Sequence, residues 1–374
     1  MKILHISKYY FPYKGGVENI CKYIVDNSQH HQVAVLCFNE GRSCCVDNVE
    51  GVTVYRVGTW VNISRQALSP LYFTMLKKAL KEFKPEVIQF HWANPFPAAV
   101  LLTMIPKNVK LIVHWHMDII QQAKIYPLIR PVETALLKRA DRVVVTSPQY
   151  KEGSIPLQPF KDKIRIVQNA MDESLFTMRK GDDEAISRLK AKYGNRKIVF
   201  FIGRHIEYKG LHWLLQAEHE VKYDCAFVIA GGGPLTAKLR GECHSDRVCF
   251  VGRLNDDELR QHYYAASVFA FPSITKNEAF GVALAEAMYC YTPAVTFHIP
   301  GSGVNWVSLD KVTGIECPNR DSSALATAID TLLSDEALSR RYAEASNKRV
   351  VENFTIPKMI EKMDEVYSEL NTLS

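Results

Sequence analysis

The stretch SITKNEAFGVALAEAM, residues 273–288, predicts a strand end, a loop and a helix. The strand-like run VFAFPS leads into it, and the segment rich in Ala, Leu and Met after Gly281 has helical character. Glu278 would then lie in the loop and Glu286 in the helix, with their carboxylates roughly 10 Å apart. This arrangement suits a nucleotide-sugar, because a diphosphate fits between carboxylates that bind the sugar and ribose hydroxyls.

The start of the predicted helix adds a site for phosphate. Main-chain amides near Phe280 to Val282 have no partner within the helix, and the helix N-terminus carries partial positive charge. An amphipathic helix with one exposed Glu and one loop Glu explains the same stretch without any ligand. The rest of the chain must decide between the two interpretations.

Length and composition indicate a globular protein of two domains. A chain of 374 residues exceeds the size at which a single core stops growing, and 47% apolar with 23% charged residues is ordinary. The longest apolar run, residues 98–105, is too short to span a membrane, and a strand begins at residue 2 without a signal peptide, so we expect a cytoplasmic location. Nine cysteines without CxxC spacing indicate neither a zinc site nor a disulfide framework.

The two halves of the chain differ in charge. Residues 1–180 carry 24 Lys/Arg and 14 Asp/Glu (+10), and residues 181–374 carry 22 and 26 (−4), which sum to the net +6. The sequence has no recognisable nucleic-acid module, so an anionic membrane surface on the inner face of the cytoplasmic membrane is the better candidate partner for the basic half. A solvated basic face without a partner is the alternative.

Strand-like and helical runs alternate along the chain, which predicts two successive α/β domains, each a doubly wound parallel sheet. We place the first domain at residues 1–180 and the second at 181–354, with a final helix, residues 355–374, packing back on the first domain. Two such domains would face each other across a cleft. The strands expected in the first half are residues 2–7, 32–38, 52–57, 87–92, 109–115, 142–147 and 164–169, and its helices are 17–27, 71–83, 96–104 and 119–140.

Two loops after predicted strands could bind a phosphate. Gly15 and Gly16 immediately precede a helix, where the missing side chains let main-chain amides approach a ligand. Arg204 and Lys209 follow the first strand of the second domain, and two cations there suit a diphosphate leaving group. An ordinary tight turn and a solvated surface pair are the alternatives.

Two further motifs point elsewhere. AGGGP, residues 230–234, lacks the glycine spacing and the acidic residue of a dinucleotide site, which argues against a Rossmann oxidoreductase. His114 and His116 end a strand and point to the same side by alternation. They could bind a metal, lie in the core or, for His116, line the cleft.

In combination, these motifs resemble the retaining glycosyltransferase family 4 (glycosyl transferases group 1), which has the GT-B fold. The resemblance rests on GG-x-E near the N-terminus, Arg204 with Lys209-Gly210, and E-AFG-x-x-x-x-E, and includes PGSG at residues 300–303. It extends over almost the whole chain. The order and spacing of the motifs carry it, because none of them is specific alone.

The resemblance implies a role for each matching residue. Arg204 and Lys209 would bind the donor diphosphate, Glu286 the ribose and Glu278 the transferred sugar. His116 would lie near the reacting face of that sugar, and Arg253 would contact the base. The residues implied in catalysis are His116, Glu278, Arg204 and Lys209. The residues implied in donor binding are Gly15, Gly16, Arg204, Lys209, Arg253, Glu278, Ala279, Phe280, Gly281 and Glu286.

We therefore expect a retaining, metal-independent hexosyltransferase without a cofactor, whose substrate is a UDP- or GDP-linked sugar. Its acceptor would be a lipid-linked or lipopolysaccharide glycan, as in O-antigen or other polysaccharide biosynthesis, and the enzyme would be peripheral on the membrane. The leaving phosphate would assist front-face attack, because the sequence offers no obvious nucleophile. A nucleotide-sugar epimerase of GT-B fold and a non-catalytic nucleotide-sugar-binding subunit are the alternatives.

Overall fold

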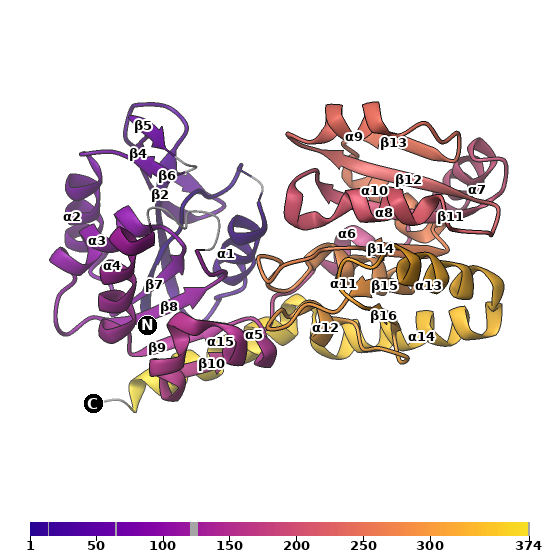
Figure 1. The fold of residues 1–374 in the computed structure, drawn as a ribbon. Coiled ribbons are helices and arrows are strands. Elements are labelled where there is room, and N and C mark those ends of the chain that lie inside the picture. The colour runs from indigo at the N-terminus through magenta and orange to yellow at the C-terminus, as the bar shows by residue number, and fades with distance from the viewer. Residues whose placement is uncertain (14, 64–65, 120–125, 373–374) are drawn as a thin grey trace. The chain divides into compact units, whose positions relative to one another are not determined.

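The computed structural model describes residues 1–13, 15–63, 66–119 and 126–372. The chain divides into two compact units (Figure 1). Unit 1 contains Met1–Gln168 and Met359–Ser374, and unit 2 contains Asn169–Lys358. Each unit is built around a parallel sheet covered by helices, so the predicted fold class of two doubly wound domains is confirmed.

The sheet of unit 1 has eight strands in the order β10-β9-β8-β7-β1-β2-β4-β3, and only the β3–β4 pair is antiparallel. The strand order reverses between β1 and β7: the chain adds β2, β4 and β3 on one side of β1, and then β7, β8, β9 and β10 on the other side. The strands are β1 (Lys2–Ile6), β2 (Gln32–Asn39), β3 (Cys45–Val49), β4 (Val52–Gly58), β7 (Val87–Trp92), β8 (Lys110–Trp115), β9 (Arg142–Val145) and β10 (Ile164–Ile166). A separate hairpin consists of β5 (Val61–Ile63) and β6 (Gln66–Leu68).

The helices of unit 1 follow the predicted ranges closely. The expected helix at residues 119–140 is described from Tyr126 to Arg139, because residues 120–125 lie outside the described residues. The edge strand β3 was not predicted, since its sequence CVDNV alternates with polar residues. The helices are α1 (Gly16–Asp26), α2 (Tyr72–Phe83), α3 (Pro95–Met104), α4 (Tyr126–Arg139), α5 (Pro148–Gly153), the 3-10 segment η1 (Ile155–Lys163) and α15 (Ile356–Asn371).

The sheet of unit 2 has six parallel strands in the order β13-β12-β11-β14-β15-β16. Its strand order reverses between β11 and β14, and ligands of doubly wound sheets bind beyond the strand ends at such a point. The strands are β11 (Lys197–Arg204), β12 (Cys225–Gly232), β13 (Val248–Gly252), β14 (Val268–Phe271), β15 (Ala294–Phe297) and β16 (Gly314–Cys317).

Hydrophobic cores on both faces of this sheet hold the helices of unit 2. One core contains Phe269, Leu284 and Val350, and the other contains Val268, Leu214 and Ile329, because neighbouring residues of a strand point to opposite faces. The helices are α6 (Glu173–Phe176), α7 (Asp182–Lys192), η2 (Glu207–Lys209), α8 (Leu211–Glu218), α9 (Thr236–Glu242), α10 (Asp256–Ala265), α11 (Val282–Tyr289), α12 (Val304–Val307), α13 (Ser322–Ser334) and α14 (Glu336–Asn353).

The boundary between the units lies at residues 168/169, and not at 180 as predicted from the polar segment TMRKGDD. Residues 169–180 belong to unit 2 because their apolar side chains enter its core. Met171 and Phe176 are buried there, and the amide of Met171 donates to the carbonyl oxygen of Phe354 at 3.0 Å. Hydrophobic packing thus decides the boundary, and polarity of the segment does not.

Helix α15 returns the chain to unit 1, whose second segment begins at Met359 where the sequence analysis gave residue 355. Its buried residues include Met359, Met363 and Tyr367. Glu369 accepts hydrogen bonds from Arg142 on β9 at 2.7 Å and from Arg165 on β10 at 2.8 Å. Figure 1 shows α15 in yellow beside these strands.

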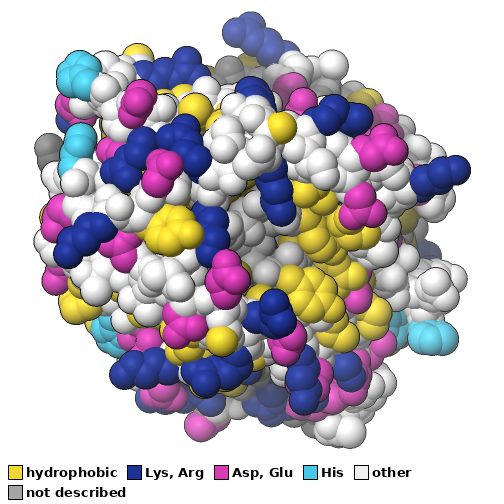
Figure 2. Space-filling model, turned by 90° about the vertical axis from the view of Figure 1, so that its right-hand side faces the viewer, with side chains coloured by type: hydrophobic (Ala, Val, Ile, Leu, Met, Phe, Trp, Pro, Cys, Tyr) yellow, Lys and Arg dark blue, Asp and Glu magenta, His cyan; other side chains and the backbone are white. Residues whose placement is uncertain are grey.

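The surface has mixed charge. On the face shown in Figure 2, Lys and Arg side chains are interspersed with Asp and Glu around a hydrophobic area. Across the described residues, the helices are all too short or too polar to cross a membrane.

Candidate functional site

The loops after β11 and β14 carry most of the predicted donor residues of unit 2. Arg204 ends β11 and Lys209 lies in the following turn η2, while Glu278 lies in the loop between β14 and α11. These are the two strands at which the sheet reverses its order. The sequence therefore places the cations and the carboxylate at the position where this type of sheet binds ligands.

The two loops are held against each other by their main chains. The amide of Ile274 donates to the carbonyl oxygen of Tyr208 at 2.9 Å. Gly210 has a φ of +64°, and a Cβ there would lie 2.0 Å from the carbonyl oxygen of Pro272. Only glycine permits this contact, which brings the Lys209 turn next to the Glu278 loop.

Lys209 and Glu278 form an ion pair through Nζ and Oε2. Their side chains are only 13% and 12% exposed, and the hydroxyl of Ser273 also donates to Glu278 Oε2 at 3.2 Å. Burial acts to lower the pKa of Lys209, but the Glu278 charge outweighs it, and the pKa of Lys209 is raised. The lysine therefore stays charged, and each partner satisfies the charge of the other.

The PGSG segment fixes the Glu278 loop from the other side. The buried hydroxyl of Ser302 donates to the carbonyl oxygen of Glu278, and the amide of Gly303 donates to the carbonyl oxygen of Ala279 at 3.0 Å. Ser302 was not predicted as a site residue. Its contact joins residues 24 apart in the chain, so the resemblance was the only signal in the sequence.

Phe280 and Gly281 shape the start of α11. Phe280 is 2% exposed, and its ring packs edge-on against Phe354 with 5.3 Å between ring centroids. Gly281 has a φ of +90°, and its carbonyl oxygen accepts from the amide of Leu284 at 3.0 Å. The side chain of Phe280 thus belongs to the core, and only its main chain can take part in a site.

Glu286 lies in α11 and accepts a hydrogen bond from the hydroxyl of Tyr263 at 2.8 Å. Burial is the main cause that raises the pKa of Glu286 to about 7. The hydrogen bond from Tyr263 lowers this pKa, the nearby charge of Asp256 raises it, and the charge of Lys209 lowers it. Lys209 therefore links the two carboxylates electrostatically. A group with this pKa changes charge near neutral pH, where a ligand can shift it.

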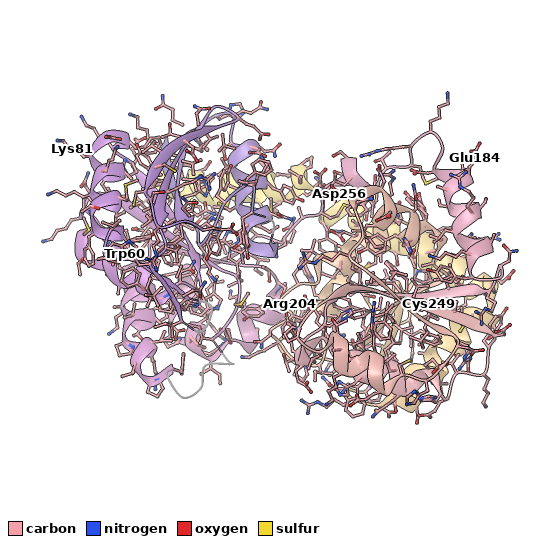
Figure 3. All side chains as sticks on the ribbon, turned by 90° about the horizontal axis from the view of Figure 1, so that it is seen from above. Trp60, Lys81, Glu184, Arg204, Cys249 and Asp256 are labelled. Carbon is pink, nitrogen blue, oxygen red and sulfur yellow. The ribbon has the colours of Figure 1, made fainter. Side chains whose placement is uncertain are left out.

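Two predicted cations of unit 2 have exposed side chains. Neither the Arg204 nor the Arg253 guanidinium makes a hydrogen bond or an ion pair with any residue that the structure describes. Figure 3 shows Arg204 and Asp256, the first residue of α10, at the same edge of unit 2. Both arginines are thus available to an anion.

In unit 1, Gly15 precedes α1 as its N-cap and has an extended backbone with a φ of −165°. A Cβ on Gly15 would lie 2.2 Å from Oε2 of Glu18, whereas none of the described atoms lies within 4 Å of a Cβ on Gly16. A side chain at position 15 would therefore displace the flexible carboxylate of Glu18. The open space beside Gly16 leaves room at the start of α1.

His116 follows β8 and is 5% exposed. Its Nε2 lies 2.9 Å from Nδ1 of His91, and its ring stacks on His114 with 4.2 Å between centroids, so the predicted shared side of His114 and His116 is confirmed. Burial lowers the pKa of His116 to about 3. Asp118 is buried and accepts hydrogen bonds from Trp115 at 3.0 Å and Ser154 at 2.6 Å, which gives it a structural role.

Comparison with known proteins agrees with this arrangement. The family described as Glycosyltransferase Family 4 matches residues 14–175, and Glycosyl transferases group 1 matches residues 182–349. The chain belongs to glycosyltransferase family 4. It has the GT-B fold and is a glycosyltransferase that acts on nucleotide sugars.

Two relatives of this glycosyltransferase match nearly their whole length. The O-antigen chain mannosyltransferase C of Escherichia coli is 29% identical over 379 residues, which cover 99% of each chain. The D-rhamnosyltransferase WbpZ of Pseudomonas aeruginosa is 27% identical and covers 95% of this chain and 92% of its own. In fold, the chain is similar to the sucrose-phosphate synthase from Thermosynechococcus elongatus, with a TM-score of 0.80, 21% identity and full coverage of both chains.

In this glycosyltransferase the glycines of AGGGP allow close main-chain packing at the carboxyl ends of β11 and β12. Gly231 has a φ of +100°, and a Cβ there would lie 2.0 Å from the carbonyl oxygen of Gly203. A Cβ on Gly233 would lie 2.6 Å from the carbonyl oxygen of His205. These glycines let the β12 loop approach the β11 loop that carries Arg204.

Proposed function

We propose that the enzyme is a retaining, metal-independent hexosyltransferase that transfers a sugar from a UDP- or GDP-linked donor to a lipid-linked or lipopolysaccharide glycan. The cluster of Lys209, Glu278 and Glu286 beside Arg204 carries this proposal. The names of the two relatives support a hexose of manno configuration, since D-rhamnose is mannose without the C6 hydroxyl.

Each group of the cluster suits one part of the donor. Arg204 and Lys209 would bind the diphosphate, and Arg253 would contact the base. Glu278 would exchange its bond with Lys209 for hydroxyls of the sugar, aided by the amides of residues 279–281. Glu286, with its pKa of about 7, would bind the ribose diol. Cationic side chains in a largely dry site can neutralise the diphosphate in place of a metal ion.

The reaction we propose proceeds on one face of the sugar. The C1–O bond to the phosphate breaks, the acceptor oxygen bonds to C1 on the same face, and the hydroxyl proton passes to the departing phosphate oxygen. In the proposed complex Glu278 binds hydroxyls of the sugar, and Asp118 is held by Trp115 and Ser154, so neither carboxylate is poised as a nucleophile. Arg204 and Lys209 stabilise the negative charge that develops on the leaving group.

Two measurements test this function. Thermal shifts with a panel of UDP-, GDP- and dTDP-sugars identify the donor, because a ligand of the native state raises the melting temperature. Donor consumption is then measured with and without a lipid-linked glycan. Transfer predicts consumption that depends on the acceptor, an epimerase would convert the donor without it, and a binding subunit would do neither.

We also propose peripheral binding to an anionic membrane on the cytoplasmic side, through unit 1. Lys77, Lys78, Lys81 and Lys84 on and after α2 are exposed, as is Phe73, at 46%. The sequence predicts this contact for two aromatic and basic stretches, residues 72–84 and 121–139. In the first, Tyr72 is fully buried; in the second, Arg139 donates to Asp141 at 3.3 Å and to the carbonyl oxygen of Val109, so these two residues are left out of the membrane surface. Arg130 and Lys138 of the second stretch are exposed, and Lys124 lies outside the described residues.

A further inference from the structure

Three histidine rings form a hydrogen-bonded row across adjacent strands of unit 1. His5 on β1 lies with Nδ1 3.3 Å from Nε2 of His91 on β7, and Nδ1 of His91 lies 2.9 Å from Nε2 of His116. His5 and His91 are fully buried, and His116 is 5% exposed. The row connects the interior of the sheet to the candidate sugar-binding histidine.

All three rings are neutral. Burial, with a contribution from His114, lowers the pKa of His5 to about 3, and burial lowers the pKa of His91 well below its usual value. A neutral imidazole carries one proton, so one ring nitrogen donates and the other accepts. The row is therefore polarised as a unit, and the proton position on His5 determines the proton positions on His91 and His116.

The two polarities differ at the buried end of the row. In one, His116 donates inward and the row ends in an N–H at Nε2 of His5, which is fully buried and has no partner among the described residues. In the other, His5 donates from Nδ1 and its Nε2 is a lone pair. A buried unpaired N–H is rarer in proteins than an unpaired acceptor, which favours the second polarity.

We propose that His5 and His91 are positioning residues that hold His116 as its Nδ1–H tautomer and so present a hydrogen-bond donor at the end of β8. The inference rests on the proposed function together with the role that the family resemblance implies for His116, near the reacting face of the transferred sugar. Nδ1 of His116 has no partner among the described residues and, unlike Nε2 of His5, is not fully enclosed. An N–H there suits a hydroxyl oxygen of the sugar. In water the Nε2–H tautomer of histidine predominates, so the row imposes the less common form.

A metal site is the competing explanation, because nitrogens of His91, His114 and His116 lie within 4.8 Å of one another. However, both nitrogens of His91 are already used in the row. The rings of His91 and His114 lie within 10° and 17° of the His116 plane. Lone pairs lie in the ring planes, so nearly parallel rings do not direct them to one point.

The tautomer of His116 can be read directly from side-chain ¹H–¹⁵N spectra of the full-length enzyme, with His116→Gln identifying its signals. We expect Nδ1 to carry the proton in the wild type and in His5→Asn, whose amide N–H replaces the Nδ1 donor. In His5→Asp, whose carboxylate accepts from Nε2–H of His91 and so reverses the row, we expect His116 to shift towards Nε2–H and kcat to fall by roughly 10–100-fold, with the KM for the donor little changed. His5→Asn should keep a kcat close to that of the wild type.

An Nε2–H tautomer in the wild type overturns the proposal, whether or not the Asp variant folds. So does a stoichiometric metal in the purified enzyme whose chelation shifts the His91 signals. The proposed function fails separately: a fully active His116→Ala enzyme contradicts the sugar contact and leaves the tautomer measurement intact.

Discussion

The Lys209 ammonium and the Glu278 carboxylate neutralise each other, although the proposed function assigns them to different parts of the donor. Donor binding must therefore open this pair and give each charge a new partner. The diphosphate would replace Glu278 beside Lys209, and sugar hydroxyls would replace Lys209 beside Glu278. The ion pair keeps two poorly solvated charges satisfied until the donor arrives.

Lys209→Ala and Glu278→Ala should each lower turnover at least roughly 100-fold, because each removes a preorganised contact to the transition state. Far-UV circular dichroism should show an intact fold. Lys238→Ala is the matched control, since Lys238 pairs with Glu242 at 3.8 Å on exposed α9 of the same unit. Near-wild-type rates in both site variants would contradict the assignment of the donor site.

Glu286 should make stability depend on pH. Its folded-state pKa of about 7 exceeds its ordinary value of 4.5, so the folded protein holds this proton more tightly than the unfolded chain. The resulting stabilisation is present at pH 4.5 and below, and is lost as the pH rises to about 7. Glu286→Gln, which stays neutral, should match the wild type at pH 5 and melt at a higher temperature at pH 8. The difference should not exceed about 3 kcal/mol.

Nucleotide affinity should rise with pH, whereas the stabilisation from Glu286 falls with pH. If the ionised Glu286 binds the ribose diol, calorimetric affinity for UDP or GDP rises between pH 6 and 8 in the wild type. Glu286→Gln should bind more weakly and without this rise, and Glu286→Ala should mainly weaken nucleotide binding. An unchanged affinity in both variants would remove Glu286 from the nucleotide site.

Ser302→Ala should lower both stability and turnover, because it leaves the carbonyl oxygen of Glu278 without its hydroxyl donor. The expected loss of stability is about 1–3 kcal/mol. Ser346→Ala is the control: Ser346 is equally buried in unit 2 and donates to the carbonyl oxygen of Thr313 at 2.8 Å. We expect similar melting temperatures for the two variants but a reduced kcat only for Ser302→Ala.

Activity should persist in excess EDTA. Arg204 and Lys209 supply the positive charge that a divalent ion would otherwise bring to the diphosphate. The measurement compares initial rates after dialysis against EDTA with rates after adding back Mg²⁺ or Mn²⁺. A strict metal requirement would count against this assignment of the two cations.

Binding to anionic vesicles should weaken steeply with salt if α2 contacts the membrane. Each basic residue near the surface contributes on the order of 1 kcal/mol, and the attraction is screened within ~10 Å. Changing Lys77, Lys78, Lys81 and Lys84 to Gln should reduce liposome flotation. The control variant changes four exposed lysines of unit 2 to Gln: Lys190, Lys192, Lys238 and Lys348. Equal flotation on neutral vesicles, or no loss in the α2 variant, would leave this face without a membrane partner.

The fold could be predicted from the sequence because each element has its own local signal. Strand β14 and helix α11 lie where the apolar run and the helix after Gly281 were expected. The boundary between the compact units lies at 168/169 where the sequence predicted 180, because Met171 and Phe176 are ordinary in sequence and only their burial assigns them to unit 2.

The contacts within the candidate site were beyond sequence reasoning. Lys209 and Glu278 are 69 residues apart, and Ser302 reaches a loop 24 residues away. His5 and His91, 86 residues apart, meet only because β1 and β7 are neighbours in the sheet. The motifs predicted which loops carry the site. The pairing of side chains depends on strand order and on close main-chain contacts, which no local sequence pattern encodes.

Helix α15 also constrains the order in which the chain can fold during synthesis. Tyr367 donates to Gln89 on β7, and Glu369 holds Arg142 and Arg165. Tyr367 and Glu369 leave the ribosome after all of unit 2. Unit 2 can therefore fold while unit 1 still lacks its last helix. The half of the enzyme that is made first is therefore the half that is finished last.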